Sequence, residues 1–581
     1  MMAGINMTTT KQKLELTWIG KDKRPRLEPR IFLEDKSLSY QSAKVITNEE
    51  GEANPAFNDN LLIHGDNLLA LKALEHQYAG KVKCVYIDPP YNTGNAFEHY
   101  EDGLEHSKWL TLMRDRIDAI YKLLASDGFM ACHIDDAEGH YLKVMLDEVF
   151  GRENYLTTLY VQVRYANKTL KQDMDFHKQI EQVHVYRKGW GAKPNLNKKN
   201  SSYEKFNYYI KELAGGKEIS LGNKRVMVFQ KGEYLIEKGV GSDDGLKEVW
   251  ASGTILDGNS SGRFFRDFLA GRSSIDGLGV LYRVDGIGDD KFPYRYFTGP
   301  QRASASKGKY YQGVPIDKLN SDNDFSTTPI ENYYDFAANF GNCRHEGGVD
   351  FRSGKKPEAL VELILKHFSN PGDLVLDSFA GSGTTAAVAH KMGRQWITIE
   401  LAEQAVTHVV PRIQSVIDGK DMTGVTEKYN WQGGGGFRYL RLAPSLLKKD
   451  DWGNWVINKE YNAEMLAEAM CKHMGFTYAP SQTQFWNHGY STETDHIYVT
   501  TGSLAYDQLK RISEEVGAER SLLICCKAFM AEGAEFSNLT LKKIPKVILN
   551  KCEWDHDDYS FTLNVLPEEQ DDEWADDDSE E

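Results

Sequence analysis

The sequence predicts an α/β protein whose main sheet is mostly parallel, and two stretches carry this prediction. Short apolar strands at residues 61–63 and 85–87 flank a helix that begins near Leu68. Farther along, strands at 374–377 and 396–400 flank a glycine-rich turn and a second helix. A strand, a helix and a strand at this spacing form a βα unit of a parallel sheet. Ligands of such sheets bind beyond the carboxyl ends of the strands, so a site is expected there.

The length and composition indicate several globular domains. The 581 residues suggest three or four domains of roughly 100–200 residues each. With 41% hydrophobic residues the chain can bury substantial cores, and no run approaches the ~18 apolar residues of a membrane span. The seven cysteines are scattered, and the N-terminus has no apolar stretch like that of a signal peptide. These features predict a cytoplasmic protein without a structural metal or a membrane partner.

Charge is distributed unevenly along the chain. The net charge is −16, which by itself argues against a nucleic-acid partner. However, 10 of the 14 residues at 568–581 are Asp or Glu, a pattern typical of a solvated, disordered tail. Residues 190–320 instead hold 21 Lys and Arg against 15 Asp and Glu. Since binding depends on the charge of one face, DNA remains a candidate partner of this segment.

The stretch CVYIDPPYNTG at residues 84–94 predicts a site that activates an amino group. Its strand ends in Asp88, and the two following prolines, Pro89 and Pro90, fix the backbone and cannot continue a sheet. Asp88 and the carbonyl of Pro89 can each accept one N–H of an exocyclic amine, which draws the nitrogen lone pair out of conjugation with its ring. Tyr91 can stack on that ring. The alternative is a proline turn with an incidental aspartate.

A second constellation, at residues 377–400, has the features of a nucleoside site. The loop SFAGSGTT follows Asp377 between a strand and a helix, so a ligand can approach the backbone while the helix N-terminus faces an anionic group. Glu400 ends the next strand, 23 residues after Asp377, where an acid can bind the two hydroxyls of a ribose. Because the loop contains GSG and not GxGxxG, a dinucleotide is not favoured. A nucleoside that carries a carboxylate fits better, and S-adenosylmethionine is such a molecule.

Residues 190–345 differ in character from the α/β segments on either side. Long regular helices disappear, and basic residues alternate with aromatic ones, as in RFFR at 263–266 and KFPYRYF at 291–297. Such interleaving fits a surface that meets phosphates and stacks on bases. The candidate DNA-binding residues are Arg263, Arg266, Arg295, Arg302, Lys307 and Lys309. An ordinary mixed α/β insert with solvated lysines is the alternative.

Residues 432–436, QGGGG, predict a flexible hinge before a separate C-terminal domain. Beyond it, strands at 496–500 and 521–527 flank a helix at 506–516, which indicates a small α/β domain without a catalytic constellation. The predicted layout is an N-terminal extension (1–55), a catalytic half (56–189), an insert (190–345), a cofactor half (346–432), an accessory or assembly domain (437–567) and an acidic tail (568–581).

The pairing of DPPY with the downstream LDSFAGSGTT resembles the amino-methylating DNA methyltransferases of the permuted β class. In that class the catalytic half precedes the cofactor half, and a target-recognition region lies between them. DPPYNTG, the helix that begins Trp109-Leu, the Ile134-Asp-Asp segment and NLLIHGDN together look like the modification subunit of type III restriction–modification systems. The similarity covers about residues 55–190 and 345–410. It implies a Rossmann-like, S-adenosylmethionine-dependent methyltransferase sheet with an inserted recognition domain.

The resemblance also implies roles for individual residues. Asp88 and the Pro89 carbonyl would orient the amino group of a target adenine, and Tyr91 would stack on the flipped base. The implied cofactor-binding residues are Asp66, Asn92, Lys356, Asp377, Phe379, Gly381, Gly383, Thr384 and Glu400. Among these, Asp66 would lie near the cofactor's adenine and Glu400 would bind its ribose. Ser378 departs from the family, which often has proline there, and this should change the stiffness of the loop more than its chemistry.

By the same resemblance, the chain is expected to methylate N6 of adenine in duplex DNA and to form a homodimer. A bacterial or archaeal source is expected, with a helicase–nuclease restriction subunit as a further partner.

Three alternatives share parts of the signature. N4-cytosine methyltransferases more often carry Ser at the position of Asp88, so adenine is favoured. RNA guanine N2 methyltransferases typically lack so large an insert. A DNA-binding specificity subunit that has lost catalysis is disfavoured, because Asp88, Tyr91, Asp377 and Glu400 are intact.

Overall fold

The structure of the chain, a computed structural model, consists of a larger unit and an inserted smaller one. It describes residues 14–44, 59–91, 102–165, 176–200, 203–251, 260–305, 307–319, 325–351, 354–530 and 536–560. One compact unit combines Met1–Asn195 with Glu331–Glu581, and the other is Leu196–Ile330. The insert is therefore shorter than the predicted 190–345. The reason is that β18 (Tyr333–Asp335) pairs with β6 (Tyr155–Gln162) in the sheet of the larger unit.

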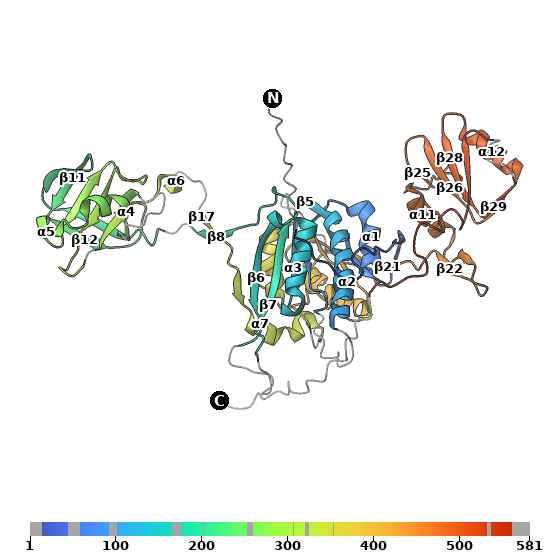
Figure 1. Cartoon of the computed structure of the whole chain (residues 1–581), viewed down its shortest axis with the longest axis horizontal. Helices are drawn as coiled ribbons and strands as arrows, with labels where there is room; N and C mark the ends of the chain where they lie inside the picture. Colours follow the sequence, from blue (N-terminus) through green and yellow to red (C-terminus); the bar gives the residue numbers. More distant parts are fainter. Residues whose placement is uncertain are drawn as a thin grey trace, which may run out of the picture. The chain divides into compact units, whose positions relative to one another are not determined.

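An 11-stranded sheet forms the centre of the larger unit (Figure 1). Five parallel strands at its centre run in the order β3, β20, β19, β4 and β5. These strands are Asn60–His64, Gln395–Glu400, Leu374–Asp377, Val82–Ile87 and Leu124–Ile134. Beyond β5, the antiparallel strand β7 (Ile180–Arg187) pairs with β6 (Tyr155–Gln162). The predicted α/β class and its mostly parallel sheet are confirmed.

Helices cover both faces of this sheet. Successive residues of a strand point to opposite faces, so Cys84 and Tyr86 of β4 lie in one hydrophobic cluster and Val85 and Ile87 in the other. The first cluster includes residues of α8 (Glu358–Phe368), α9 (Thr384–Lys391) and α10 (Val410–Ile417). The second includes residues of α1 (Asn67–Tyr78), α2 (Asp102–Leu123) and α3 (Asp136–Phe150), which lie together in Figure 1. This three-layer arrangement buries the apolar strands on both sides.

The strand order brings distant parts of the sequence together. β19 lies between β4 and β20 and pairs in parallel with both of them. The two βα units that the sequence predicts are thus interleaved in one sheet, because β3 of the first unit pairs with β20 of the second. Consequently Asp88, Asp377 and Glu400 all lie at the carboxyl edge of neighbouring strands.

The predicted hinge at residues 432–436 is wrong. Residues 433–436 are buried, and the Gly434 N–H donates to the carbonyl of Ile417 at 2.7 Å. The φ angles of Gly433, Gly434 and Gly435 are +85°, +117° and +81°, which explains the glycines in a packed turn. The turn leads into β21 (Gly436–Leu442), which pairs with β3 in the main sheet, so the accessory domain begins after this strand.

The N-terminal residues join the same edge of the sheet. β1 (Phe32–Glu34) and β2 (Tyr40–Gln41) both pair antiparallel with β21. Arg30 is 2% exposed and forms ion pairs with Glu28 at 3.1 Å and with Asp557 at 2.8 Å. The predicted N-terminal extension is therefore, over residues 14–44, an integral part of the larger unit.

The residues after Leu442 form the small α/β domain that the sequence predicts. Five strands pair in the order β24, β25, β26, β28 and β30. Their bounds are Thr477–Tyr478, Gly489–Tyr490, Asp495–Val499, Ser521–Cys526 and Leu539–Lys543. The helices α11 and α12 are Ala463–Met474 and Tyr506–Val516, and two short strand pairs complete the domain: β22 (Leu447–Lys449) with β23 (Trp455–Ile457), and β27 (Ser503–Leu504) with β29 (Ala528–Phe529).

The smaller unit is mostly antiparallel β structure. Six strands pair in the order β10, β11, β14, β15, β16 and β13. Their bounds are Lys217–Leu221, Lys224–Phe229, Leu281–Asp285, Tyr294–Thr298, Gly308–Gln312 and Lys247–Ala251. Two further pairs are β9 (Tyr208–Glu212) with β12 (Tyr234–Lys238), and β8 (Asn197–Asn200) with β17 (Phe325–Thr328).

The aromatic residues of this unit build its core. Phe264, Phe265, Phe297 and Tyr310 are each at most 7% exposed and lie in one hydrophobic cluster. The expectation that the interleaved aromatics of this segment stack on bases is therefore wrong for these four. In RFFR the two phenylalanines are buried and the two arginines exposed, whereas Arg295 is buried together with Tyr296 and Phe297.

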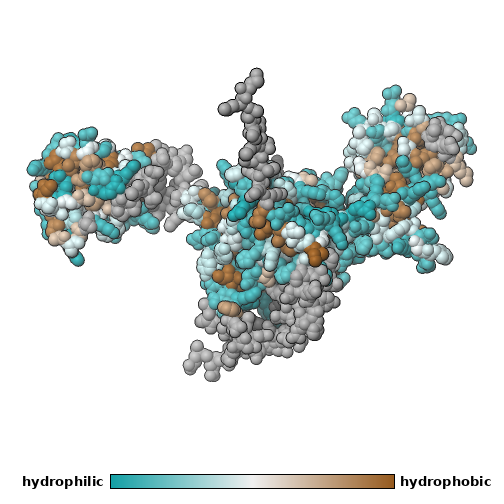
Figure 2. All heavy atoms as spheres, viewed as in Figure 1, coloured by the Kyte–Doolittle hydropathy of each residue, from teal (hydrophilic) through white to brown (hydrophobic). Residues whose placement is uncertain are grey.

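The described residues contain no helix that is long and apolar enough to cross a membrane. Figure 2 shows hydrophilic residues over most of the visible face of the body that contains the 11-stranded sheet, with hydrophobic residues in small separate groups. Scattered groups of this kind are normal for a protein surface.

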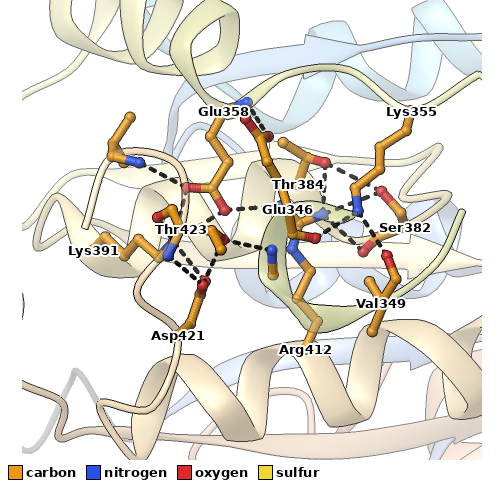
Figure 3. Close-up of polar contacts among 12 residues, drawn as sticks. Glu346, Val349, Lys355, Glu358, Ser382, Thr384, Lys391, Arg412, Asp421 and Thr423 are labelled. Atoms are coloured by element: carbon orange, nitrogen blue, oxygen red, sulfur yellow. Dashed lines mark hydrogen bonds and ion pairs between the residues drawn. The ribbon is translucent and has the colours of Figure 1, made fainter. Parts of the chain in front are cut away.

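A buried group of charged side chains packs behind the loop that follows β19 (Figure 3). Glu358, at the start of α8, is 0% exposed and accepts hydrogen bonds from Lys391 at 2.8 Å and from Arg412 at 2.8 Å. Lys391 also pairs with Asp421 at 2.6 Å. Two carboxylates thus balance two cations, which is the condition for keeping such charges inside a protein.

We expect Glu358→Ala to lower the free energy of unfolding by about 3–5 kcal/mol, because it leaves Arg412 without a carboxylate partner in the interior. Urea denaturation followed by circular dichroism would measure the change. Lys420→Ala is a matched control, because its side chain is 75% exposed and its ion pair with Asp418 lies at the surface. That control should leave the urea midpoint in place. Equal midpoints for Glu358→Ala and the unmodified protein would contradict the role of this network.

Candidate active site

Three carboxylates meet where neighbouring parallel strands end. Asp88 follows β4, Asp377 ends β19 and Glu400 ends β20. Asp377 is 4% exposed, and it accepts the N–H of Phe379 at 2.9 Å. Burial raises the pKa of Asp377 to about 7. The hydrogen bonds from Thr385 and Phe379 lower this pKa, whereas the negative charges of Asp88 and Glu400 raise it further. A nearby positive charge would therefore shift Asp377 to its ionised form near neutral pH.

The loop between β19 and α9 leaves open space beside its backbone. Gly381 and Gly383 have φ angles of +52° and +77°, which glycine adopts without strain. A Cβ added at Gly381 would meet no atom within 4 Å, whereas one added at Gly383 would lie 2.9 Å from Val409. Glu400 accepts the N–H of Gly381 at 2.8 Å, and burial raises the pKa of its carboxyl. Packing therefore requires Gly383, while Gly381 borders room for a ligand.

The charged network of Figure 3 supports this loop from behind. Arg412 donates to the hydroxyl of Thr384 at 2.8 Å and to the hydroxyl of Ser382 at 3.2 Å. Thr384 is the first residue of α9 and is only 5% exposed. Its hydrogen bond with Arg412 therefore holds the start of the helix from the interior.

Asp88 is engaged on both of its carboxylate oxygens. The Tyr91 hydroxyl donates to Oδ1 at 2.9 Å, and the Lys356 ammonium lies 3.1 Å from Oδ2. Lys356 also lies over the ring of Tyr91, 4.8 Å from the centroid. The indole N–H of Trp109 donates to the carbonyl of Pro90 at 2.7 Å, which holds the turn after β4 in place.

A second carboxylate, Glu181, faces the same ammonium. Its Oε2 atom lies 3.5 Å from Lys356 Nζ and 2.7 Å from His133 Nε2, and it accepts the Tyr91 hydroxyl at 3.0 Å. Burial alone would raise the pKa of Glu181, but Lys356 and His133 hold it well below its usual range. Burial alone would lower the pKa of Lys356, but Asp88 and Glu181 raise it. Both groups are therefore charged at neutral pH.

Glu181 and His133 are absent from the residues predicted from the sequence, and Lys356 was assigned to the cofactor set. The contacts of Lys356 place it with Asp88 instead. Glu181 is the second residue of β7, which runs antiparallel to β5 with Gln182 opposite Ile134. The start of an antiparallel strand lies beside the ends of its parallel neighbours. An acid at the start of EQVHVYR was thus the signal that could have identified Glu181.

Asp66 has a structural role that the sequence analysis missed. Its Oδ1 accepts the N–H of Leu69 at 3.0 Å and caps α1. Its Oδ2 accepts from Arg116 at 3.2 Å and from the backbone N–H of Tyr559 at 3.0 Å. Asp66 is 1% exposed, so it supports the end of β3 from within. Of the other predicted cofactor residues, Phe379 is half-buried against the α1–α3 cluster, and Asn92 lies outside the described residues.

The six basic residues predicted to contact DNA differ in their surroundings. Arg263, Arg302 and Lys307 are exposed. Arg266 pairs with its neighbour Asp267 at 2.7 Å, and Lys309 pairs with Glu248 at 2.8 Å. Arg295 is 4% exposed and forms an ion pair with Asp290, so its prediction as a DNA contact is wrong. It stabilises the core of the smaller unit instead.

Comparison with known proteins identifies the family. A family model described as DNA methylase matches residues 82–411. The chain is 32% identical over 432 residues to the probable type III restriction-modification enzyme HindVI Mod subunit of Haemophilus influenzae, which covers 66% of this chain and 54% of that subunit. It is 31% identical over 523 residues to the EcoP15I Mod subunit of Escherichia coli, covering 76% of this chain and 73% of the relative.

A type II methyltransferase, M.EcaI of Enterobacter cloacae, is 25% identical over 411 residues and covers 67% of this chain and 76% of the relative. The match to the HindVI subunit, in contrast, spans little more than half the length of that subunit. The match to the family model covers more than half of the chain and contains both the Asp88 turn and the Asp377 loop. The chain belongs to the DNA methylase family.

Proposed function

We propose that this chain is a site-specific methyltransferase that transfers a methyl group from S-adenosylmethionine to the N6 amino group of adenine in duplex DNA. One observation carries the proposal. The turn from Asp88 to Tyr91 and the loop after Asp377 lie side by side, because β4 and β19 are paired. An acceptor for an amino group and an open backbone loop therefore share one edge of the sheet. The type III modification subunits among the relatives support a role in a type III-like restriction–modification system.

Asp88 has the chemistry needed to activate the amino group of adenine. Its carboxylate and the Pro89 carbonyl each accept one N–H, which turns the nitrogen lone pair away from the ring. The nitrogen lone pair would attack the methyl carbon in line, so that the new N–C bond forms as the C–S bond breaks and S-adenosylhomocysteine leaves, and Asp88 can take the proton that the nitrogen then loses. No residue needs to form a covalent bond to the base. The catalytic contribution of the chain is therefore mainly positioning, which can account for several orders of magnitude in rate.

The residues at the end of β19 fit S-adenosylmethionine, which when bound supplies an electrophilic methyl group on a sulfonium. The open side of Gly381 admits a ligand next to the backbone. Asp377 would balance the positive charge of the ligand's methionine part. Glu400 accepts the N–H of Gly381 on Oε2 and that of Ala402 on Oε1, and a further lone pair on either oxygen would accept from a ribose hydroxyl.

The DNA partner and the assembly follow from the remaining parts of the chain. A base inside a duplex cannot reach Asp88, so the target adenine must be flipped out, and Tyr91 would stack on it. We assign sequence recognition to Leu196–Ile330 and place its exposed Arg263, Arg302 and Lys307 near DNA. Within these bounds the chain holds 20 Lys and Arg against 17 Asp and Glu, a smaller excess than in 190–320. We further propose a homodimer, with residues 443–560 as a docking domain and a restriction subunit as a partner.

The reaction is tested with purified protein, duplex DNA and S-adenosylmethionine carrying a labelled methyl group. Chromatography of the hydrolysed DNA should show the label as N6-methyladenosine. Asp88→Ala should lower the rate by more than about 10²-fold while cofactor affinity persists, because Asp88 touches the target amine and not the cofactor. Glu427→Ala, at an exposed position of the same unit, is the control and should be as active as the unmodified protein. Label in N4-methylcytosine or only in RNA would overturn the assignment.

Cofactor affinity should depend on pH through Asp377. The pKa of this carboxyl is raised to about 7 in the free protein, and a positive ligand favours its ionised form. Affinity should therefore weaken as the pH falls from 8 to 6, by up to about tenfold per unit below the pKa. Isothermal titration at both pH values measures this change. Asp377→Asn should bind more weakly at pH 8 and lose the dependence, whereas an unchanged slope would assign it to another group.

Exchanging residues 196–330 for the corresponding unit of a relative should move the methylated sequence to that of the donor. The boundaries are those of a compact unit, so the exchange leaves the main sheet intact. Methylation-sensitive sequencing of host DNA would show the motif, and unchanged cofactor affinity would confirm an intact sheet. If the original motif persisted, recognition would belong to another segment, such as residues 443–560.

A further inference from the structure

The active site contains a carboxylate that the proposed reaction does not use. The side chain of Glu181 is 17% exposed, and that of Lys356 is 8% exposed. Lys356 lies between two acids, 3.1 Å from Asp88 Oδ2 and 3.5 Å from Glu181 Oε2. Two carboxylates thus face one ammonium among largely buried side chains, and Glu181 contacts His133 as well. A single carboxylate would suffice to pair the ammonium, so the second one requires an explanation.

The explanation lies in what the target amino group must displace. Tyr91 and Lys356 occupy both oxygens of Asp88, and Lys356 also covers one face of the Tyr91 ring. Each oxygen of Asp88 keeps a further lone pair, but a base that stacks on the face of Tyr91 covered by Lys356 has to move this ammonium. If Lys356 gave way without another partner, its ammonium would be left unpaired inside the protein, which is costly. Glu181 is the acid already within reach.

We propose that Glu181 is a positioning residue that takes over the ammonium of Lys356 when the target amino group binds Asp88. This inference rests on the proposed function, since it concerns the same site and the same amine. The transfer requires a small movement, because Lys356 Nζ is 0.4 Å closer to Asp88 than to Glu181 in this structure (3.1 and 3.5 Å). It frees one oxygen of Asp88 and uncovers the ring on which the base stacks.

The surroundings of Glu181 hold it ready for this exchange. His133 is 0% exposed, and its Nε2 lies 2.7 Å from Glu181 while its Nδ1 lies 2.9 Å from the Tyr86 hydroxyl. The Tyr91 hydroxyl lies 3.0 Å from Glu181 Oε2 and 2.9 Å from Asp88 Oδ1, so the two carboxylates share its single proton. These contacts hold the Glu181 carboxylate within 3.5 Å of the Lys356 ammonium. With Lys356 paired to Glu181, the charge of Asp88 is left to balance the positive charge that develops on the amine.

A double-mutant cycle with Glu181→Gln and Lys356→Met tests this inference. Glutamine keeps the size and the acceptor of Glu181 but loses its charge, so Lys356 would stay on Asp88. Single-turnover methyl transfer should then slow on the order of 10- to 100-fold, while cofactor affinity and the thermal unfolding midpoint stay unchanged. Glu181→Asp, which restores the charge, should recover part of the rate. In the Lys356→Met background, Glu181→Gln should cost less than about threefold, because Glu181 acts through Lys356.

The possible outcomes separate this inference from the function on which it rests. A Glu181→Gln rate within about twofold of the unmodified protein, or rate losses that multiply in the double variant, would overturn the positioning role while leaving adenine methylation intact. Absence of label in DNA with the unmodified protein would refute the proposed function itself. Glu427→Gln, at an exposed position, is the control variant and should retain the full rate.

Discussion

The active site is organised around one buried ammonium group between two carboxylates. Lys356 pairs with Asp88 and faces Glu181, and each of these three residues comes from a different part of the chain. Such a group is stable only while its charges remain paired. The end of β4, the start of β7 and the segment before α8 must therefore meet at one point. The strand order of the sheet, with β5 between β4 and β7, satisfies this requirement.

A short segment, residues 355–358, connects this point to the rest of the site. Lys355 donates to the carbonyls of Glu346 and Val349, and burial lowers its pKa to about 8. Lys356 reaches Asp88, and Glu358 binds Arg412, which in turn holds the loop around Thr384. Neighbouring residues of this segment thus position both Asp88, which would bind the amine, and the loop around Thr384. A shift of this segment would disturb both the contact of Lys356 with Asp88 and that of Glu358 with Arg412. The buried ion pairs around the segment hold it in place.

Much of this arrangement could be predicted from local sequence patterns. The helix at 506–516 and the strand at 374–377 match the structure at both ends, because their apolar spacing and flanking turns are local signals. The Asp88 turn and the Asp377 loop were also evident. The role of Glu181 was not evident from the sequence, because its partner Lys356 is far away along the chain. Arg295 and the glycines at 433–435 were misassigned, since composition does not reveal which side chains and turns are buried.

In the proposed site, Lys356 changes partner when the amine binds Asp88. The most direct measurement is a crystal structure of the protein with duplex DNA containing the target adenine and S-adenosylhomocysteine. We expect the adenine amino nitrogen within about 3 Å of Asp88, Lys356 Nζ within about 3 Å of Glu181, and more than about 4 Å between Lys356 and Asp88. A flipped adenine with Lys356 still bonded to Asp88, and Glu181 turned away from it, would show that Lys356 does not change partner.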